Sequence, residues 1–314
     1  MNQLTVLVLS GGISHEREIS LRSGRRVSDA LEQAGYRVRN AEPDADLLRT
    51  LQSDRPDVVF PALHGASGED GALLGLLGAL NVPYVGSSAA AALRAWSKPT
   101  ARHTVAEAGV AVPAGLVLTR DAFRELSAPG VLEVVAATNG FPLVVKPGHG
   151  GSAQGVSIVT EPEGLARALV DAFTYADTAV CETFVAGTEV AVSVIETDEG
   201  ASVLPPVEIV PLNGVYGFEA RYNAGETRFF APARLAPDVL RRLEEAALIA
   251  HRALALRDVS RIDFIVDQNG CPWFLEANVI PGMTETSLLP LALDAAGILP
   301  SDAYGRLVQR AAAR

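Results

Sequence analysis

Two carboxylates and an amide stand close together in the stretch RIDFIVDQNGCPWFLEAN, residues 261–278. The Asn-Gly pair at 269–270 suits the centre of a two-residue type I′ hairpin, because both positions need positive φ. A hairpin closed there pairs Asp263 with Glu276 on one face of the sheet, and Asn278 shares that face. Facing carboxylates repel unless one is protonated or a cation lies between them. The pattern therefore predicts a Mg²⁺ or Mn²⁺ site, with a solvated strand face of scattered charges as the alternative for the hairpin alone.

The opposite face of this hairpin should be buried on a core, since strand residues alternate between two faces. That face is expected to carry Ile262, Phe264, Val266, Trp273, Leu275 and Ala277. Pro272 has no N–H to donate, so the second strand should be an edge strand or a slightly irregular one.

The chain of 314 residues is long enough for two or three domains. Lys plus Arg number 26 and Asp plus Glu 37, which gives a formal net charge of −11 and makes nucleic acid or an anionic membrane an unlikely partner of the surface. The two cysteines lack metal-ligand spacing and fit a reducing cytoplasm, although one disulfide is compatible with the sequence. The N-terminus reads as a strand more than as a secretory signal, and no apolar run is long enough to span a membrane.

Strands and helices alternate in the first part of the chain. The expected order is a strand at 4–10, a helix at 20–36, a strand from about 37, a short helix at 44–53 and a strand at 57–63. This alternation predicts a parallel sheet with ligands at the carboxyl ends of its strands, where the polar loops SGGISHERE and HGASGEDG follow. A first domain is placed at 1–96.

A glycine-rich loop follows in the middle region. Lys98 begins a helix, and the run FPLVVKPGHGGSAQGVSIV joins two β-rich segments through a loop with four glycines between 148 and 155. Backbone N–H groups that turn inward there, together with Lys146, could cradle a phosphate. The loop lacks the Gly-Lys-Ser/Thr of a Walker A motif, and an ordinary hairpin loop is the alternative. A helix at about 161–175 and the strand TAVCETFV complete this region.

Seven short motifs occur in a characteristic order between Gly11 and Ser287: HEREIS, LHGASGEDG, VVKP with GGS, YGFEARY, SRIDF, LEAN and PGMTETS. Together they resemble the D-alanine–D-alanine ligases of the ATP-grasp superfamily. The resemblance implies an α/β ATP-grasp fold, in which an N-terminal Rossmann-like parallel-sheet domain (1–96) is followed by central (97–187) and C-terminal (188–314) α+β domains that clamp ATP.

The same resemblance implies a reaction. In this family, ATP phosphorylates the carboxylate of one D-alanine, and the amine of a second D-alanine attacks the acyl phosphate to give the dipeptide, ADP and phosphate for peptidoglycan synthesis. ATP is then a co-substrate, and two Mg²⁺ or Mn²⁺ ions lie over Asp263, Glu276 and Asn278. We also expect a homodimer in the cytoplasm.

The resemblance assigns one set of residues to the nucleotide. It places Lys98 and Lys146 on phosphate oxygens, Glu182 with Phe184 and Val185 around the adenine, Glu189 on the ribose, and Arg221 in the cofactor site just before the lid tyrosine. Each has a plainer alternative, because exposed Lys and Glu are usually solvated and a lone Phe is usually core.

A second set is assigned to the amino acids. Glu16 resembles the acid that holds the ammonium of the first D-alanine, in a network with Ser152 and Tyr222. Arg261 and backbone N–H groups near Gly282 resemble the oxyanion donors, Ser287 the group that receives the second carboxylate, and His64 a residue near the first substrate. A salt bridge from Arg261 to Asp263 and a structural role for His64 are the alternatives. The segment 212–225 reads as a mobile lid that keeps water from the acyl phosphate.

Departures from the family pattern leave other functions open. Arg221 stands where lysine is common, Ala153 lacks a hydroxyl, Thr183 replaces a charged residue, and NVIPG replaces the usual NTxPG. One alternative is a related ATP-grasp ligase of resistance or specialised metabolism that makes another dipeptide, a D-serine product or D-alanyl-D-lactate, although Tyr222 disfavours the lactate product. A regulatory protein that has lost catalysis is a second alternative. A dinucleotide oxidoreductase is disfavoured because Gly11-Gly12 lacks the G-x-G-x-x-G fingerprint.

Overall fold

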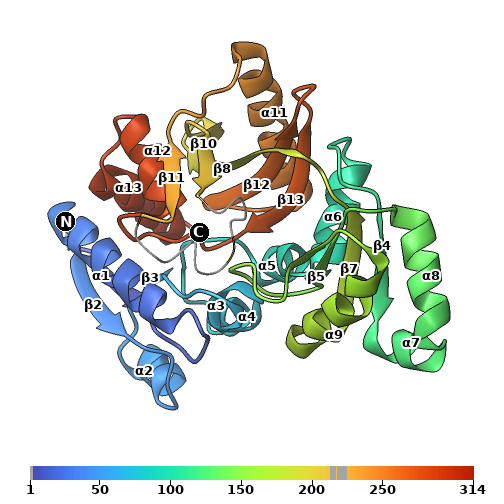
Figure 1. Ribbon diagram of the computed structural model, residues 1–314. Helices are drawn as coiled ribbons and strands as arrows, with labels where there is room; N and C mark the ends of the chain where they lie inside the picture. The colour runs from blue at the N-terminus through green and yellow to red at the C-terminus, as the bar shows by residue number, and fades with distance from the viewer. Residues whose placement is uncertain (1–2, 213–216, 218–224) are drawn as a thin grey trace.

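A parallel sheet forms the first part of the computed structural model, which describes residues 3–212, 217 and 225–314 (Figure 1, blue). Its strands are β1 (Thr5–Leu9), β2 (Arg37–Ala41) and β3 (Val58–Pro61), in the order β2-β1-β3. The helices of this region are α1 (Arg17–Gln33), α2 (Leu47–Ser53), α3 (Ala66–Glu69), α4 (Ala72–Ala79) and α5 (Ala89–Trp96). The predicted parallel sheet is therefore confirmed, and its polar loops follow the carboxyl ends of β1 and β3.

An antiparallel sheet with its own core forms the central region (Figure 1, green). Its strands β4 (Gly115–Thr119), β5 (Leu143–Pro147), β6 (Ser157–Val159) and β7 (Thr178–Thr183) lie in the order β4-β7-β5-β6. Its helices are α7 (Arg120–Glu125), α8 (Ala128–Asn139), the short 3₁₀ helix η1 (Pro162–Gly164) and α9 (Leu165–Tyr175). Leu165, Leu169 and Phe173 repeat every fourth residue along α9, so that one face of the helix is buried on the sheet.

A second antiparallel sheet makes up most of the remainder (Figure 1, yellow to red). Its strands are β8 (Gly187–Thr197), β9 (Gly200–Val203), β10 (Val207–Pro211), β11 (Thr227–Phe230), β12 (Val259–Asp267) and β13 (Pro272–Asn278). The order is β11-β10-β8-β12-β13, and β9 pairs with β8. The helices are α11 (Pro237–Ala253), α12 (Leu288–Ala295) and α13 (Pro300–Ala312).

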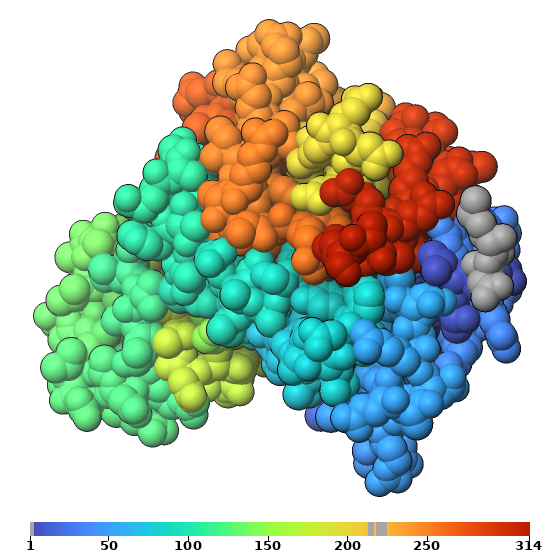
Figure 2. Space-filling view, turned by 180° about the vertical axis from the view of Figure 1, so that it is seen from behind, coloured from blue at the N-terminus to red at the C-terminus, as the bar shows by residue number. Residues whose placement is uncertain are grey.

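Buried side chains of the first and last regions pack together in a common core, whereas the central sheet packs around a core of its own. One apolar cluster joins Leu7 and Leu63 to Val192 and Phe274, and a separate cluster lies wholly between Val131 and Cys181. Helix α6 (Lys98–Glu107) packs against β13 and α11. Figure 2 shows the C-terminal helix, in red, beside the blue N-terminal region, where α13 packs against α1 and β3. The three domain ranges stay predictions.

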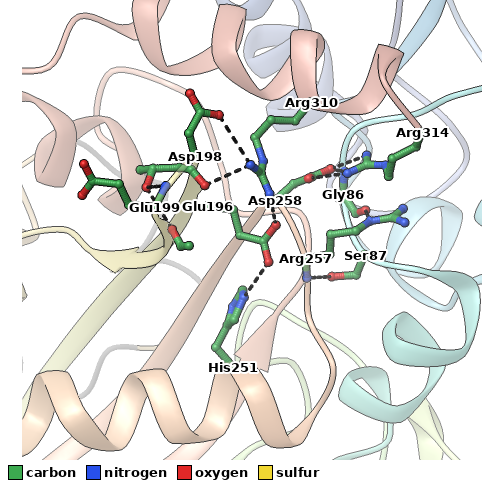
Figure 3. A network of polar contacts seen from close by, with 12 residues as sticks. Gly86, Ser87, Glu196, Asp198, Glu199, His251, Arg257, Asp258, Arg310 and Arg314 are labelled. Atoms are coloured by element: carbon green, nitrogen blue, oxygen red, sulfur yellow. Dashed lines mark hydrogen bonds and ion pairs between the residues drawn. The ribbon is translucent and has the colours of Figure 1, made fainter.

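A network of polar contacts also ties the first region to the last (Figure 3). The carboxylate of Asp258 is completely buried, accepts a hydrogen bond from the Gly86 N–H at 2.7 Å and pairs with Arg314 at 2.7 Å. Arg257 donates to the Gly86 carbonyl at 2.8 Å and to the Ser87 hydroxyl at 3.1 Å. The loop before α5 is therefore held against the start of β12. Among the described residues, no helix is long and apolar enough to cross a membrane.

The hairpin of β12 and β13 has the predicted pairing at its open end but not at its turn. Asp263 pairs with Glu276, as predicted, and β13 is the edge strand that Pro272 indicated. The predicted two-residue turn is wrong. The loop is 268–270, with Asp267 N–H bonded to the Cys271 carbonyl at 3.1 Å, and only its last residue, a glycine at φ +72°, is left-handed.

A β-bulge between the turn and the Asp263–Glu276 pair restores the pairing predicted from the sequence. Phe264 pairs with Phe274, so Leu275 is the extra residue before Glu276. Phe274 is completely buried in the core, in place of the expected Trp273 and Leu275, which are only partly buried. The rest of the expected buried face is confirmed: Ile262, Phe264, Val266 and Ala277.

Candidate active site

A cleft with two parts lies between the central sheet and the other two regions. We call one part the inner pocket; its lining includes Glu16, His64, Ser152, Arg261, Asn278, Gly282 and Ser287. We call the other part the outer cleft; its lining includes Lys146, Glu182, Phe184, Val185, Glu189 and Asp263. The two parts share Lys98, Gly150, Gly151 and Glu276. Every predicted site residue that the structure describes therefore lines this cleft, whereas Arg221, Tyr222 and most of the predicted lid lie outside the described residues.

The paired carboxylates of the hairpin each contact a cation. Arg261 holds both oxygens of Asp263, with nitrogen–oxygen distances of 2.7 Å, and Lys98 Nζ lies 3.0 Å from Glu276 Oε2. The structure thus contains both the Arg261–Asp263 salt bridge, which was an alternative from the sequence, and the facing pair of Asp263 and Glu276. Asn278 lines the inner pocket together with Glu276, and its Oδ1 accepts a hydrogen bond from the Ile280 N–H at 3.1 Å.

These three side chains offer a hard oxygen donor set that fits Mg²⁺ or Mn²⁺. No group of three His, Cys, Asp or Glu residues that could hold a metal occurs in residues 3–212, 217 and 225–314. A metal at this place would accordingly depend on the two carboxylates, the Asn278 amide oxygen and further oxygens from a ligand.

Lys98 is positioned by the beginning of α6. The Ser97 hydroxyl caps the helix by accepting from the Thr100 N–H, and Pro99 suits the first turn. The ammonium of Lys98 donates to the Gly150 carbonyl, which brings the helix start against the glycine-rich loop. The junction between the inner pocket and the outer cleft is therefore built from a lysine, two glycines and a carboxylate.

Lys146 and Glu182 form a buried ion pair on neighbouring strands of the central sheet. Lys146 Nζ lies 2.7 Å from Glu182 Oε1, and the Glu182 residue is 2% exposed. Burial, and then the positive charges of Arg102 and Lys98, lower the pKa of Lys146 well below its ordinary value. Arg102, which contacts the other oxygen of Glu182, was not singled out from the sequence. Its position four residues after Lys98, on the same face of α6, was the available signal.

The inner pocket gathers polar side chains from the loops after β1 and β3. The Ser152 hydroxyl donates to Glu16, as the predicted network requires. His64 is buried, and its Nε2 lies 2.9 Å from the Ser23 hydroxyl oxygen. Burial lowers the pKa of His64 to about 4. Glu69 also lines the pocket, and burial, followed by the Glu16 charge, raises its pKa well above its ordinary value. Glu69 belongs to the loop HGASGEDG but was not among the predicted site residues.

The far wall of the inner pocket is the loop before α12. Ser287 is the residue before the helix, and its hydroxyl accepts from the Thr284 N–H at 3.0 Å. A Cβ at Gly282 would lie 2.7 Å from the Ser287 hydroxyl oxygen, so a larger residue would force this hydroxyl to move. The backbone N–H groups at the start of a helix favour an anion, which suits a carboxylate here.

Two family models match most of the chain. The model described as the D-ala D-ala ligase C-terminus matches residues 104–309, and that of the D-ala D-ala ligase N-terminus matches residues 38–87. The chain belongs to the D-alanine–D-alanine ligase family. The ATP-grasp fold and the ligase class predicted from the motifs are therefore confirmed.

Curated relatives and solved structures of D-alanine–D-alanine ligases extend over nearly the whole chain. The protein is similar to the D-alanine–D-alanine ligase of Anaeromyxobacter sp. (strain K), with 39% identity over 98% of this chain and 96% of the relative. That of Desulforudis audaxviator is 41% identical over 98% of both chains. The Bacillus anthracis ligase, solved in complex with ATP, matches with a TM-score of 0.80 and 27% identity over 98% of this chain and 96% of that one. VanG, the D-Ala:D-Ser ligase of Enterococcus faecalis, has a TM-score of 0.85 at 24% identity over 99% of this chain and 100% of that one, and therefore supports the fold alone.

The roles of single residues in this D-alanine–D-alanine ligase family member stay predictions. The structure brings the described candidates into one cleft, and it adds Glu69 and Arg102 to them.

Proposed function

We propose that this protein uses ATP to join two D-alanines through an acyl phosphate, giving D-alanyl-D-alanine, ADP and phosphate for peptidoglycan synthesis. The observation that carries the proposal is the shared wall of Lys98, Gly150, Gly151 and Glu276 between the inner pocket and the outer cleft. A nucleotide in the outer cleft can present its terminal phosphate at this wall to an amino-acid carboxylate in the inner pocket. A homodimer and a cytoplasmic location stay predictions.

In the first half of the reaction, the inner pocket binds and orients one D-alanine. The Glu16 carboxylate, held by Ser152, is suited to its ammonium group. Lys98 and Lys146 are suited to phosphate oxygens in the outer cleft. Asp263, Glu276 and Asn278 would hold Mg²⁺ or Mn²⁺, which supplies positive charge that offsets the polyphosphate during phosphoryl transfer.

In the second half, the amine of the second D-alanine attacks the acyl phosphate carbon and phosphate leaves. Ser287 and the start of α12 are placed to receive the carboxylate of this second substrate. The Arg261 guanidinium and the Gly282 N–H lie on the same pocket, where they can stabilise the developing oxyanion. Arg261 is held in place by its two bonds to Asp263.

The test is phosphate release with ATP, Mg²⁺ and a panel of D- and L-amino acids and D-lactate, with the product identified by mass. We expect D-alanine alone to support turnover and to give the dipeptide. Preference for D-serine or D-lactate as second substrate would move the protein to a related ligase, and phosphate release without a condensed product would contradict the proposal.

Glu276→Gln tests the metal face of the same proposal. The variant should fold, because Glu276 lies at the cleft surface, but it should bind Mg²⁺ weakly and lose nearly all ligation. Glu245→Gln, on the exposed face of α11, is the matched control. Turnover of the Glu276 variant at the wild-type rate and ordinary Mg²⁺ concentration would contradict the assignment of Glu276 as a metal ligand.

A further inference from the structure

Arg102 lies behind the outer cleft rather than on its surface. It follows Lys98 by four residues on the buried face of α6, and its residue is 8% exposed. One terminal nitrogen of the guanidinium contacts Glu182 Oε2, and the other donates to the Pro113 carbonyl at 2.5 Å. Because Pro113 precedes the first strand of the central sheet, Arg102 is anchored at a fixed point. It meets the cleft through Pro113 and Glu182, which both line it, and of these two only Glu182 carries a charge.

Glu182 is therefore held by cations on both oxygens. Lys146 contacts Oε1 from β5, and Arg102 contacts Oε2 from α6. A buried carboxylate that loses its last partner carries an uncompensated charge, which is strongly unfavourable. Lys146 can leave Glu182 at little cost only if a second cation stays behind.

The surrounding charges also favour the departure of Lys146. Arg102 and Lys98 face its ammonium from α6, Glu182 from β7 and Glu276 from β13. The ammonium also donates to the Leu275 carbonyl at 3.5 Å. Arg102, Lys98 and Lys146 outnumber Glu182 and Glu276 by one positive charge. An ammonium between two other cations gains from an added anion such as a phosphate oxygen.

We propose that Arg102 is a positioning residue of the nucleotide site, which keeps Glu182 neutralised so that Lys146 can exchange Glu182 for a phosphate oxygen of ATP. This inference rests on the proposed function, since it takes ATP as the occupant of the outer cleft. Arg102 itself contacts no substrate in this scheme. Its effect passes entirely through Glu182 and Lys146.

The experiment measures ATP binding by calorimetry with Mg²⁺ and without D-alanine. Arg102→Met should weaken ATP binding by on the order of 10- to 100-fold, because Lys146 is then the one cation that the described residues leave on Glu182. Arg102→Lys should recover most of the affinity, and the KM for D-alanine should change less than about twofold. Arg94→Met is the matched control, since Arg94 also donates to a backbone carbonyl, that of Leu254 at 2.9 Å, but lies outside the cleft lining.

A double-mutant cycle separates this role from a structural one. In the Glu182→Gln background no carboxylate remains to be neutralised, so adding Arg102→Met should change ATP affinity less than about twofold. This pair removes one buried cation and one buried anion together, which protects folding if the single methionine variant does not fold. Equal loss of affinity in both backgrounds would overturn the inference.

The pH profile of ATP binding gives a second readout. Loss of the Arg102 charge raises the pKa of Lys146, so the alkaline decline in ATP affinity should move to higher pH in Arg102→Met and stay in place in Arg94→Met. An unmoved decline would count against the inference. If the wild-type protein binds ATP but forms no dipeptide, the proposed function alone is refuted. If the wild-type protein binds no ATP, the proposed function and the role of Arg102 are both refuted.

Discussion

Replacing His64 with glutamine should make the stability of the protein less sensitive to acid. His64 is 4% exposed, and its Nε2 lies 2.9 Å from the Ser23 hydroxyl. That hydroxyl accepts a hydrogen bond from the Met283 N–H at 3.2 Å, and its own proton can be donated to Nε2 of a neutral imidazole. Glutamine can accept the same hydrogen bond through its amide oxygen, but it does not titrate.

The magnitude follows from the pKa of His64 in the folded protein. Burial lowers this pKa from 6.5 to about 4, so the unfolded chain binds the proton more tightly than the folded one. Stability from this group is complete above pH 6.5 and is lost as the pH falls toward 4. The shift corresponds to about 3 kcal/mol in all, of which roughly 2 kcal/mol is lost between pH 7 and pH 5.

The assay is urea unfolding of wild type and His64→Gln at pH 7 and at pH 5. We expect the free energy of unfolding to fall by about 2 kcal/mol more in the wild type than in the variant. Other groups that titrate in this range, such as His251, are present in both proteins and cancel. His103→Gln, at an exposed position of α6, should behave like the wild type. Equal losses in wild type and His64→Gln would refute a neutral, buried His64.

Three further predictions concern single side chains. Glu16→Gln should raise the KM for the first D-alanine by weakening a charge-assisted contact of roughly 1.5–3 kcal/mol while leaving ATP binding unchanged; steady-state kinetics check this, and the reverse pattern would show that Glu16 is misplaced. Tyr222→Phe should raise the ratio of D-alanyl-D-lactate to D-alanyl-D-alanine, most clearly at low pH where the amine is protonated, and an unchanged ratio across pH would leave the tyrosine a packing role. Burial raises the pKa of Cys181 to about 12, so a thiol reagent at pH 8 should modify Cys181 only after denaturation; rapid labelling of the native protein at this position, located by peptide mass, would contradict its burial.

The parallel sheet and the position of its polar loops were predictable because their signals are local, whereas most single cleft residues were assigned from the resemblance to a known family. A strand that ends in a polar loop indicates a binding edge, and the loops with Glu16 and His64 do meet at the inner pocket. The facing of Asp263 and Glu276 was also predicted correctly, but two errors offset each other there. The turn has one residue more than expected, and the bulge at Leu275 takes up that residue.

The remaining features depend on contacts between distant segments. The spacing within α6 places Arg102 on the same face as Lys98, but it does not show that Arg102 meets Glu182, 80 positions later, behind the cleft. The burial of Asp258 likewise depends on Gly86 and Arg314, which lie 172 and 56 positions away in the sequence. A buried charge is stable only with its partners, and those partners are known only once the fold is known.

The bulge in β13 also changes the spacing of groups along the cleft. In a regular strand, two side chains on the same face are two residues apart, or about 6.6 Å. Leu275 and Glu276 are adjacent in sequence, yet both line the outer cleft. An apolar residue and a carboxylate therefore line the cleft at consecutive positions, while Phe274 stays in the core. The extra residue of the bulge lets this edge strand place an apolar and a charged residue next to each other on the cleft, at a spacing that a regular strand does not allow.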